Sequence, residues 1–116
     1  MKKRTVLGLT EPVIMVGPDG KQKQCIARID TGATKSSIDI GLAREMDLGP
    51  AQGRKLVKST NGMSFRPVMK ATVLLAGNRI TQEFNVADRS HLRYRVLIGQ
   101  NILRLHGFII DPVKKK

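Results

Sequence analysis

The residues best suited to chemistry lie in one short run, Ile29-Asp30-Thr31-Gly32-Ala33-Thr34. Asp30 supplies a carboxylate, which can take or give a proton, and it directly follows an apolar stretch typical of a strand. Gly32 lets backbone come close to that carboxylate, Thr31 can donate its hydroxyl to a neighbouring turn, and Ala33 leaves room for a substrate backbone. Because Asp-Thr-Gly also describes an ordinary Asx turn, the tripeptide has to be weighed with its surroundings.

The element that carries Asp30 is one of several short strands that the sequence predicts. Apolar and polar residues alternate before it, with Cys25, Ala27 and Ile29 on one face. Glycine-containing turns separate the apolar runs, and Asn61-Gly62 is the strongest hairpin signal among them. The predicted strands are 13–16, 24–29, 36–38, 54–59, 64–75, 80–86, 96–98 and 108–110.

Two short helices are expected between these strands. Asp39 is placed to cap one or two helical turns through Leu42, Ala43 and Met46, and a further short helix is predicted from Asn101 to Leu105. The chain has 116 residues, 41% of them hydrophobic and only four aromatic, so we expect one domain, 1–116, with a core of Val, Ile, Leu and Met. This composition favours a mostly β structure.

A second stretch, Val96-Leu97-Ile98-Gly99-Gln100-Asn101-Ile102-Leu103, makes the pattern more specific. Together with Asp30 to Ala33 it resembles the paired active-site segments of retroviral-type aspartic peptidases. The resemblance implies a small closed β-barrel of the acid-protease (retropepsin-like) type with one short C-terminal helix. It also implies that the second stretch supports the site, with the apolar strand passing under the Asp30 turn at Gly99. The implied supporting residues are Ile98, Gly99, Gln100 and Asn101.

The same resemblance assigns roles around the turn. Asp30, Thr31 and Gly32 would be catalytic, while Ala33 and Thr34 would contact the substrate. The hairpin predicted at Asn61-Gly62 would be a flap formed by 60–65 and closing over the substrate. Its implied contact residues are Asn61, Gly62 and Met63.

A closer resemblance covers almost the whole chain. It is to a prokaryotic family of small retropepsin-like proteins that are labelled ATP-dependent zinc proteases and found beside ligases that add glutamate to ribosomal protein. The matching segments are 29–37, 66–68, 87–90, 94–99 and 107–112.

The zinc and ATP in that label have little support from the residues. His91 and His106 are far apart in sequence, Cys25 is the single cysteine, and no His-Glu-x-x-His or paired cysteine spacing occurs. No glycine-rich nucleotide-binding loop followed by Lys-Ser/Thr is present either. We therefore expect no metal, no ATP and no other cofactor.

The chain departs from the retroviral pattern at two linked positions. Retroviral enzymes usually carry an acid directly after the alanine and an arginine directly after the later glycine, where this chain has Thr34 and Gln100. Losing one member of a partly buried ion pair would leave an uncompensated charge, but replacing both with neutral polar groups can be nearly neutral in stability. We expect a hydrogen bond to replace the ion pair.

An aspartic peptidase needs two carboxylates about 3 Å apart that share one proton. The sequence holds a single Asp-Thr-Gly, and Asp39, Asp88 and Asp111 lack the neighbouring small residues that would cradle a second catalytic carboxylate. Symmetry is the economical answer, so we predict a homodimer with Asp30 from each copy at the twofold axis. Retroviral dimers use their chain ends, whereas both ends here are lysine-rich and would repel one another. Asp111, next to Pro112, is expected to be structural.

The net charge of +12 indicates attraction to an anionic partner: an acidic peptide, a nucleic acid or a membrane surface. Solvated basic ends explain part of this charge equally well. The link to glutamate ligases suggests glutamate-rich tails as substrate. The candidate contacts for such tails are Lys35, Arg66 and Arg89.

The sequence predicts a cytoplasmic protein. Its lone cysteine fits a reducing compartment, Glu11 and Pro12 interrupt the first apolar run, and no run reaches the 18 or so residues of a membrane span. Two functions remain open: a homodimeric aspartic endopeptidase, or a catalytically inactive retropepsin-like module that binds an anionic partner, which could be a nucleic acid, the ribosome or an acidic peptide. No membrane partner is expected. Nucleic acid is the less favoured partner, because sparse aromatics leave little for base stacking.

Overall fold

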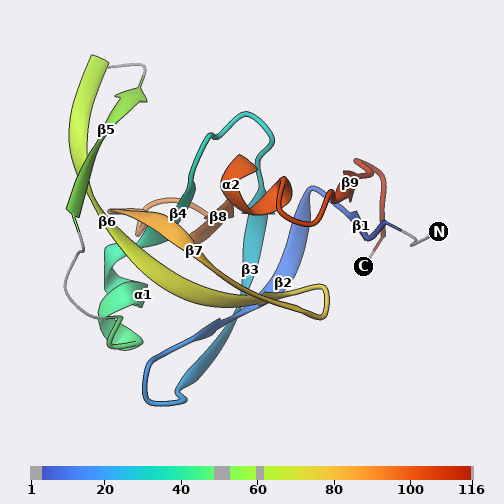
Figure 1. Cartoon of the computed structure of the whole chain (residues 1–116), viewed down its shortest axis with the longest axis horizontal. Helices are drawn as coiled ribbons and strands as arrows, with labels where there is room; N and C mark the ends of the chain where they lie inside the picture. Colours follow the sequence, from blue (N-terminus) through green and yellow to red (C-terminus); the bar gives the residue numbers. More distant parts are fainter. Residues whose placement is uncertain (1–3, 49–52, 60–61, 116) are drawn as a thin grey trace.

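The computed structural model describes residues 4–48, 53–59 and 62–115, and within 53–59 and 62–66 it describes the backbone alone. Strands dominate the described chain, with two short helices between them (Figure 1). The strands are β1 (Val6–Leu7), β2 (Thr10–Val16), β3 (Gln22–Ile29), β4 (Ser36–Asp39), β5 (Gly53–Ser59), β6 (Gly62–Leu75), β7 (Asn78–Ala87), β8 (Val96–Ile98) and β9 (Ile109–Ile110). The helices are α1 (Ile40–Glu45) and α2 (Gln100–Leu103).

The sheet closes on itself. Its strand order is β2-β3-β8-β4-β7-β6-β5, and β2 also pairs with β6 from Val13↔Leu75 to Val16↔Thr72. Six strands therefore form a ring: β2, β3, β8, β4, β7 and β6. Strand β5 lies outside the ring, and among the described strands it pairs with β6 alone. The predicted small closed β-barrel is confirmed.

The barrel is filled by aliphatic side chains, as the scarcity of aromatic residues predicts. A single cluster of buried hydrophobic residues draws members from every strand of the ring and from both helices. Phe84 is the one fully buried aromatic residue among those described. On β3, Ala27 and Ile29 are buried while Gln24, Ile26 and Arg28 are exposed, which confirms the alternation expected from the sequence.

Strand β8 lies between the two strands that flank the Asp30 turn. It pairs in parallel with β3 and antiparallel with β4. The chain leaves β3 at Asp30 and returns at Ser36 on the other side of β8, so the connecting turn has to pass over the end of β8. This topology brings the two predicted active-site segments together although they are far apart in sequence.

Both expected helices are present, with small differences in their ends. Asp39 caps α1, because its Oδ2 accepts the Leu42 N–H at 3.2 Å. Helix α2 begins one residue before the predicted start and ends at Leu103 rather than Leu105. The fold therefore contains α1 in addition to the one C-terminal helix that the resemblance implies. No helix of the described residues is long and apolar enough to cross a membrane.

Strands β1 and β9, near the two chain ends, pair in a small parallel sheet (Figure 1). Periodicity cannot predict a strand as short as β1, and the sequence analysis did not predict it. Near this sheet Lys114 Nζ lies 2.9 Å from Glu11 Oε2, and Glu11 is nearly buried. One charge of the basic C-terminal end is thus neutralised within the chain.

Candidate active site

The Asp30 turn is fixed to β8 by its backbone and folded back on itself by its side chain. The Asp30 N–H donates to the Ile98 carbonyl at 2.9 Å, and the Ala33 N–H donates to the Asp30 carbonyl at 3.3 Å. Oδ1 of Asp30 accepts the Gly32 N–H at 2.9 Å. Within the described chain Oδ2 has no hydrogen-bond partner, and the residue is only half-buried. One carboxylate oxygen is therefore held in place while the other stays available.

Gly99 lies directly beneath this turn. A Cβ at this position would be 2.5 Å from the Lys35 carbonyl oxygen and 2.8 Å from the Ala33 carbonyl oxygen. Both contacts are to backbone, which cannot move aside cheaply, so only glycine lets the strand pass this closely. The sequence-based expectation that Gly99 packs under the turn agrees with this geometry.

Gln100 and Asn101 continue the support beyond Gly99. The backbone N–H of Gln100 donates to the Ala33 carbonyl at 2.8 Å, and that of Asn101 donates to the Thr34 carbonyl at 3.2 Å. The Gln100 side chain donates from Nε2 to the Thr31 carbonyl at 2.8 Å. A neutral hydrogen bond at Gln100 was expected in place of the retroviral ion pair. Its acceptor is the Thr31 backbone, not the Thr34 side chain.

Ser36 is a site residue that the sequence analysis missed. It is fully buried, its Oγ donates to Asn101 Oδ1 at 2.8 Å, and the same Oγ accepts the Gly99 N–H at 3.0 Å. Asn101 Oδ1 also accepts the Ser36 N–H, and Asn101 Nδ2 donates to the Glu83 carbonyl. This network joins β4, α2 and β7 under the turn. A small polar residue at a strand start was the only sequence signal.

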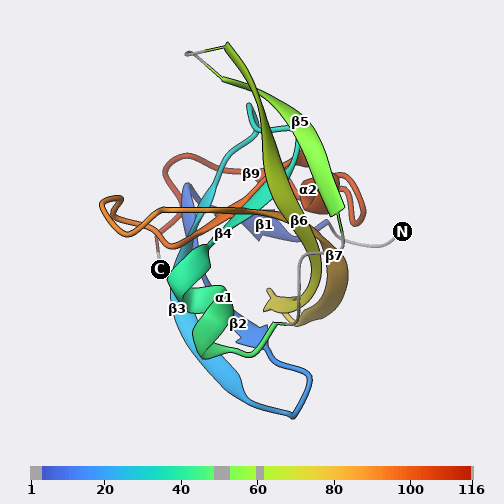
Figure 2. The ribbon, with the colours of Figure 1, turned by 90° about the vertical axis from the view of Figure 1, so that its left-hand side faces the viewer.

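The proposed substrate contacts are partly visible. Thr31, Gly32 and Thr34 are exposed and Ala33 is half-buried, so this surface of the turn is open. Gly62 and Met63 begin β6, opposite Ser59 and Lys58 of β5, whereas Asn61 lies outside the described residues. Figures 1 and 2 both place the β5–β6 pair and the 30–35 turn at the same end of the molecule.

Asp39 differs from Asp30 in being buried and in accepting several hydrogen bonds. Its side chain accepts hydrogen bonds from the backbone N–H groups of Leu42 and Arg89 and from the Arg95 guanidinium, whose Nη2 lies 3.1 Å away. Burial alone would raise its pKa, but these hydrogen bonds outweigh burial and hold the pKa of Asp39 below its usual value. Gly41 does stand close to Asp39 Oδ2, so the expectation that no small residue cradles Asp39 was wrong. The cradle serves the helix cap.

Two other carboxylates are used locally. Asp88 is exposed and accepts hydrogen bonds from the Ser90 hydroxyl and N–H, which lower the pKa of Asp88. Asp111 accepts the Val113 N–H at 3.0 Å and its own N–H donates to the Leu7 carbonyl, in keeping with its expected structural role. Neither is placed beside the Asp30 turn by the described contacts.

Two of the three cations named as contacts for acidic tails, Lys35 and Arg89, already have partners. Lys35 Nζ lies 3.5 Å from Glu83 Oε1, and Arg89 Nε donates to the Tyr94 carbonyl at 3.0 Å. The Arg66 side chain lies outside the part that the structure describes. An acidic substrate would therefore have to compete with existing bonds at Lys35 and Arg89.

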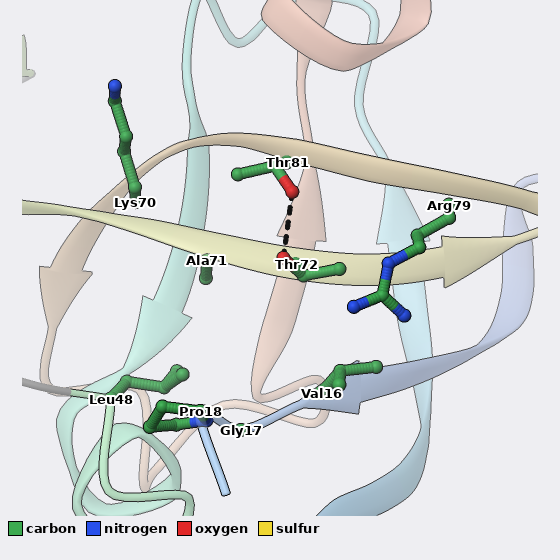
Figure 3. A pocket seen from close by; sticks show the side chains of 9 residues that line it. All are labelled: Val16, Gly17, Pro18, Leu48, Lys70, Ala71, Thr72, Arg79 and Thr81. Carbon is green, nitrogen blue, oxygen red and sulfur yellow. Dashed lines mark hydrogen bonds between the residues drawn. The ribbon is translucent and has the colours of Figure 1, made fainter. Parts of the chain in front are cut away.

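The described residues show neither a cluster of metal-binding side chains nor, in the hollow beside β6 and β7, cations that point at one ligand. They contain no group of three or more His, Cys, Asp or Glu side chains that could hold a metal ion. A hollow of about 260 Å³ lies on the outside of the barrel, and Figure 3 shows the side chains that line it. Two of them, Thr72 and Thr81, form a hydrogen bond of 2.8 Å between their hydroxyl groups. The hollow's two cations, Lys70 and Arg79, point in different directions, so they do not converge on one ligand.

A broader hollow of about 430 Å³ lies next to the Asp30 turn. It combines the turn's edge with apolar side chains from α2 and the C-terminal segment. Its lining consists of Thr31, Gln100, Leu103, Arg104, Gly107, Phe108 and Ile110. Nearby in the chain, Leu105 is 54% exposed and Ile109 is 43% exposed. Apolar surface is thus left uncovered beside the candidate catalytic residue.

Comparison with known proteins agrees with this architecture. The model of the RimB-like family, described as the retropepsin-like aspartic endopeptidase RimB, matches residues 46–116, a stretch that begins after the Asp30 turn. Among solved structures, the chain resembles Lpg0085 of Legionella pneumophila, a protein of unknown function, with a TM-score of 0.67 and 17% identity over 97% of each chain. It also resembles the Simian Foamy Virus protease, with a TM-score of 0.60 and 15% identity over 82% of this chain and 91% of the viral one. No curated protein gives a significant match.

Proposed function

Because the chain belongs to the RimB-like family of retropepsin-like aspartic endopeptidases, we propose that it hydrolyses peptide bonds as a homodimer with one Asp30 from each copy in a shared active site. The observation that carries this proposal is the Asp30 carboxylate itself. It sits on a turn tied to Ile98, Gly99 and Gln100, and it keeps Oδ2 free of hydrogen bonds within the described chain. Asp30 therefore has one carboxylate oxygen held by the turn and one that can still bond to water or substrate.

Two carboxylates are needed because the reaction needs a base and an acid at once. One carboxylate takes a proton from water while the other, protonated, donates to the scissile carbonyl oxygen. No described contact places a second carboxylate beside Asp30 itself: Glu83 is paired with Lys35 at the end of the turn, and Asp39 is bonded to α1 and Arg95. A second copy of Asp30 supplies the missing group by symmetry.

The apolar hollow beside Thr31 is the surface that we propose for the dimer contact. Phe108 and Ile110 line it, and burying them against a second copy would be favourable at about 25 cal/mol per Å² of apolar area. The ion pair between Lys114 and Glu11 supports this arrangement, because it reduces the repulsion between the basic chain ends. In the dimer Thr31, Gly32 and Ala33 would line the cleft, and the 60–65 hairpin would close over the substrate.

The proposed substrate is a peptide or protein segment rich in acidic residues. The support is the net charge of +12, which favours encounter with acidic chains. Incubation with a glutamate-tailed peptide and with its glutamine counterpart, followed by mass spectrometry, tests this preference. Equal cleavage of the two peptides would remove the acidic preference while leaving the peptidase proposal in place.

Peptidase activity is tested with Asp30→Asn and with Asp88→Asn as the matched control. Asp88 is exposed and bonded only to Ser90 in the described chain, so its substitution should leave cleavage unchanged. We expect Asp30→Asn to abolish cleavage and the wild type to show a bell-shaped pH profile, because one carboxylate must be ionised and the other protonated. Cleavage that persists in Asp30→Asn would refute the proposal. The net charge also supports a second candidate, an inactive anion-binding module, for which salt-sensitive binding unaffected by Asp30→Asn would be the signature.

A further inference from the structure

One edge of β3 is open over most of its length. Strand β2 pairs with β3 from Gln22 to Arg28, but β8 covers only Ala27 to Ile29 on the other side. Within 4–48, 53–59 and 62–115, no strand pairs with that second edge of Gln22–Ile26. Figure 1 shows this part of β3 extending with β2 toward the hairpin at the bottom of the view.

The N–H and C=O groups of alternate β3 residues point toward β2 and away from it. The Gly17 N–H donates to the Lys21 carbonyl and the Ile29 N–H donates to the Leu9 carbonyl, so the odd-numbered residues of β3 face β2. The peptide groups of Gln22 and Gln24 therefore point away from β2, where the described chain offers them no strand. An unpaired strand edge of this kind is a template onto which an extended chain can add.

A groove of about 340 Å³ adjoins the open edge, lined by Cys25, Ile26, Arg93, Tyr94 and Arg95. Ile26 is 37% exposed and contributes apolar surface. The Arg93 guanidinium lies 5.5 Å from the centre of the Tyr94 ring, and Arg93 has no acidic partner in the described chain. Burial raises the pKa of the Cys25 thiol, while the charges of Arg95 and Lys23 oppose it, which indicates that both cations lie close to this groove.

We propose that the open edge of β3 is a docking site for an extended acidic peptide segment, distinct from the site at Asp30. The peptide would bond to the Gln22 and Gln24 backbone groups, and its acidic side chains would meet Lys23 and Arg93. The charges beside the edge favour an acidic peptide. Three cations lie there: Lys23, Arg93 and Arg95. In the described residues Lys23 and Arg93 have no ion pair, whereas Arg95 is paired with Asp39 and Glu45. A second copy of this chain would instead bring the same cations together. A nucleic acid would leave the peptide groups unused.

The charge component is tested with the full chain carrying Asp30→Asn, which prevents cleavage of the probe. The probe is a fluorescein-labelled heptapeptide of alternating Glu and Val, with Gln in place of Glu as its neutral control. We expect Arg93→Glu to weaken binding of the acidic probe by about tenfold, and Arg79→Glu, the same charge change on the far strand β7, to weaken it by less than about twofold. Equal losses in both variants, or equal binding of both probes, would overturn the proposal.

The backbone component is tested at Gln24. Gln24→Pro removes the outward-facing N–H and keeps the N–H groups that bond to β2, whereas Gln24→Ala keeps all of them, so binding should be lost in the first variant and kept in the second. A probe N-methylated at alternate residues should likewise fail to bind the otherwise unaltered protein, which covers the case in which the proline variant misfolds. The bound probe should also slow alkylation of Cys25, the single cysteine. Normal binding to Gln24→Pro, unchanged Cys25 alkylation, or equal protection by a short single-stranded RNA would contradict the proposal.

Discussion

Asp30 and Asp39 flank the same segment, yet they are held in opposite ways. Asp30 is half-buried and its side chain accepts one described hydrogen bond, from the Gly32 N–H. Asp39 is 2% exposed, and its two oxygens accept hydrogen bonds from α1, from the Arg89 N–H and from Arg95. The carboxylate suited to catalysis is therefore the one whose oxygens are not both bonded within the described chain.

The largest effect on activity should come from removing the Asp30 carboxylate. Asp30→Ala should lower kcat/KM by about a thousandfold or more, equivalent to about 4 kcal/mol of transition-state stabilisation. Its free energy of unfolding should stay within about 1 kcal/mol of the wild type, because one side-chain hydrogen bond in the described chain, to the Gly32 N–H, is lost. Kinetics and urea denaturation of the same preparation measure both. If Asp30→Ala strongly lowered the free energy of unfolding, Asp30 would be a structural residue like Asp39, and the proposed difference between the two would be wrong.

Asp39→Ala should show the reverse pattern. We expect the free energy of unfolding to fall by about 3 kcal/mol, because the variant loses the α1 cap and leaves Arg95 and the Arg89 N–H without their buried acceptor. Urea denaturation again gives the value. Asp88→Ala, at an exposed carboxylate, is the matched control and should change stability by less than about 0.5 kcal/mol. A similarly small change in Asp39→Ala would show that its bonds contribute little.

Glycine at the crossing under the turn should also matter. Gly99→Ala should cost about 2 kcal/mol of stability, because the added Cβ meets the backbone of Ala33 and Lys35. Gly32→Ala is a useful comparison, since a Cβ there would meet only Asp30 Oδ1, at 3.3 Å. Thermal unfolding of both variants tests this ranking, and it fails if Gly32→Ala is the less stable of the two.

Acid should weaken the fold through Asp39. Its pKa is depressed in the folded state, so its contribution to stability is complete above the ordinary value of 3.8 and is lost as the pH falls through the lower folded value. The stability difference between wild type and Asp39→Asn should therefore shrink as the pH falls below 3.8. Urea midpoints of both proteins between neutral and acidic pH measure it, and a constant difference would show that Asp39 does not titrate in this way.

The smallest effect concerns the side chain that replaces the retroviral arginine. Gln100→Ala should cost about 1 kcal/mol, because it removes the bond from Nε2 to the Thr31 carbonyl. Gln22→Ala, at an exposed glutamine on β3, is the matched control and should be neutral. If both variants unfold at the same urea concentration, Gln100 does not hold the turn.

Local patterns account for what could be predicted. The Asp30 turn, the Asp39 cap and the strand alternation around Cys25 each depend on a few neighbouring residues, so the sequence alone displays them. The contacts that the sequence did not reveal join distant segments: Ser36 with Asn101, and Asp39 with Arg95. These contacts form because β8 lies between β3 and β4, and no short stretch of sequence shows that pairing. Strand β1 was missed because its two residues carry no period.

Mixing wild-type and Asp30→Asn chains tests the central claim most directly. The two proteins are unfolded together, refolded at constant total concentration and assayed for cleavage as the fraction of wild-type chain varies. If both Asp30 side chains are required in one site, activity falls with the square of that fraction, and an equal mixture keeps about a quarter of the wild-type activity. A linear fall, with about half of the activity left in the equal mixture, would mean that each chain works alone and would contradict the shared active site.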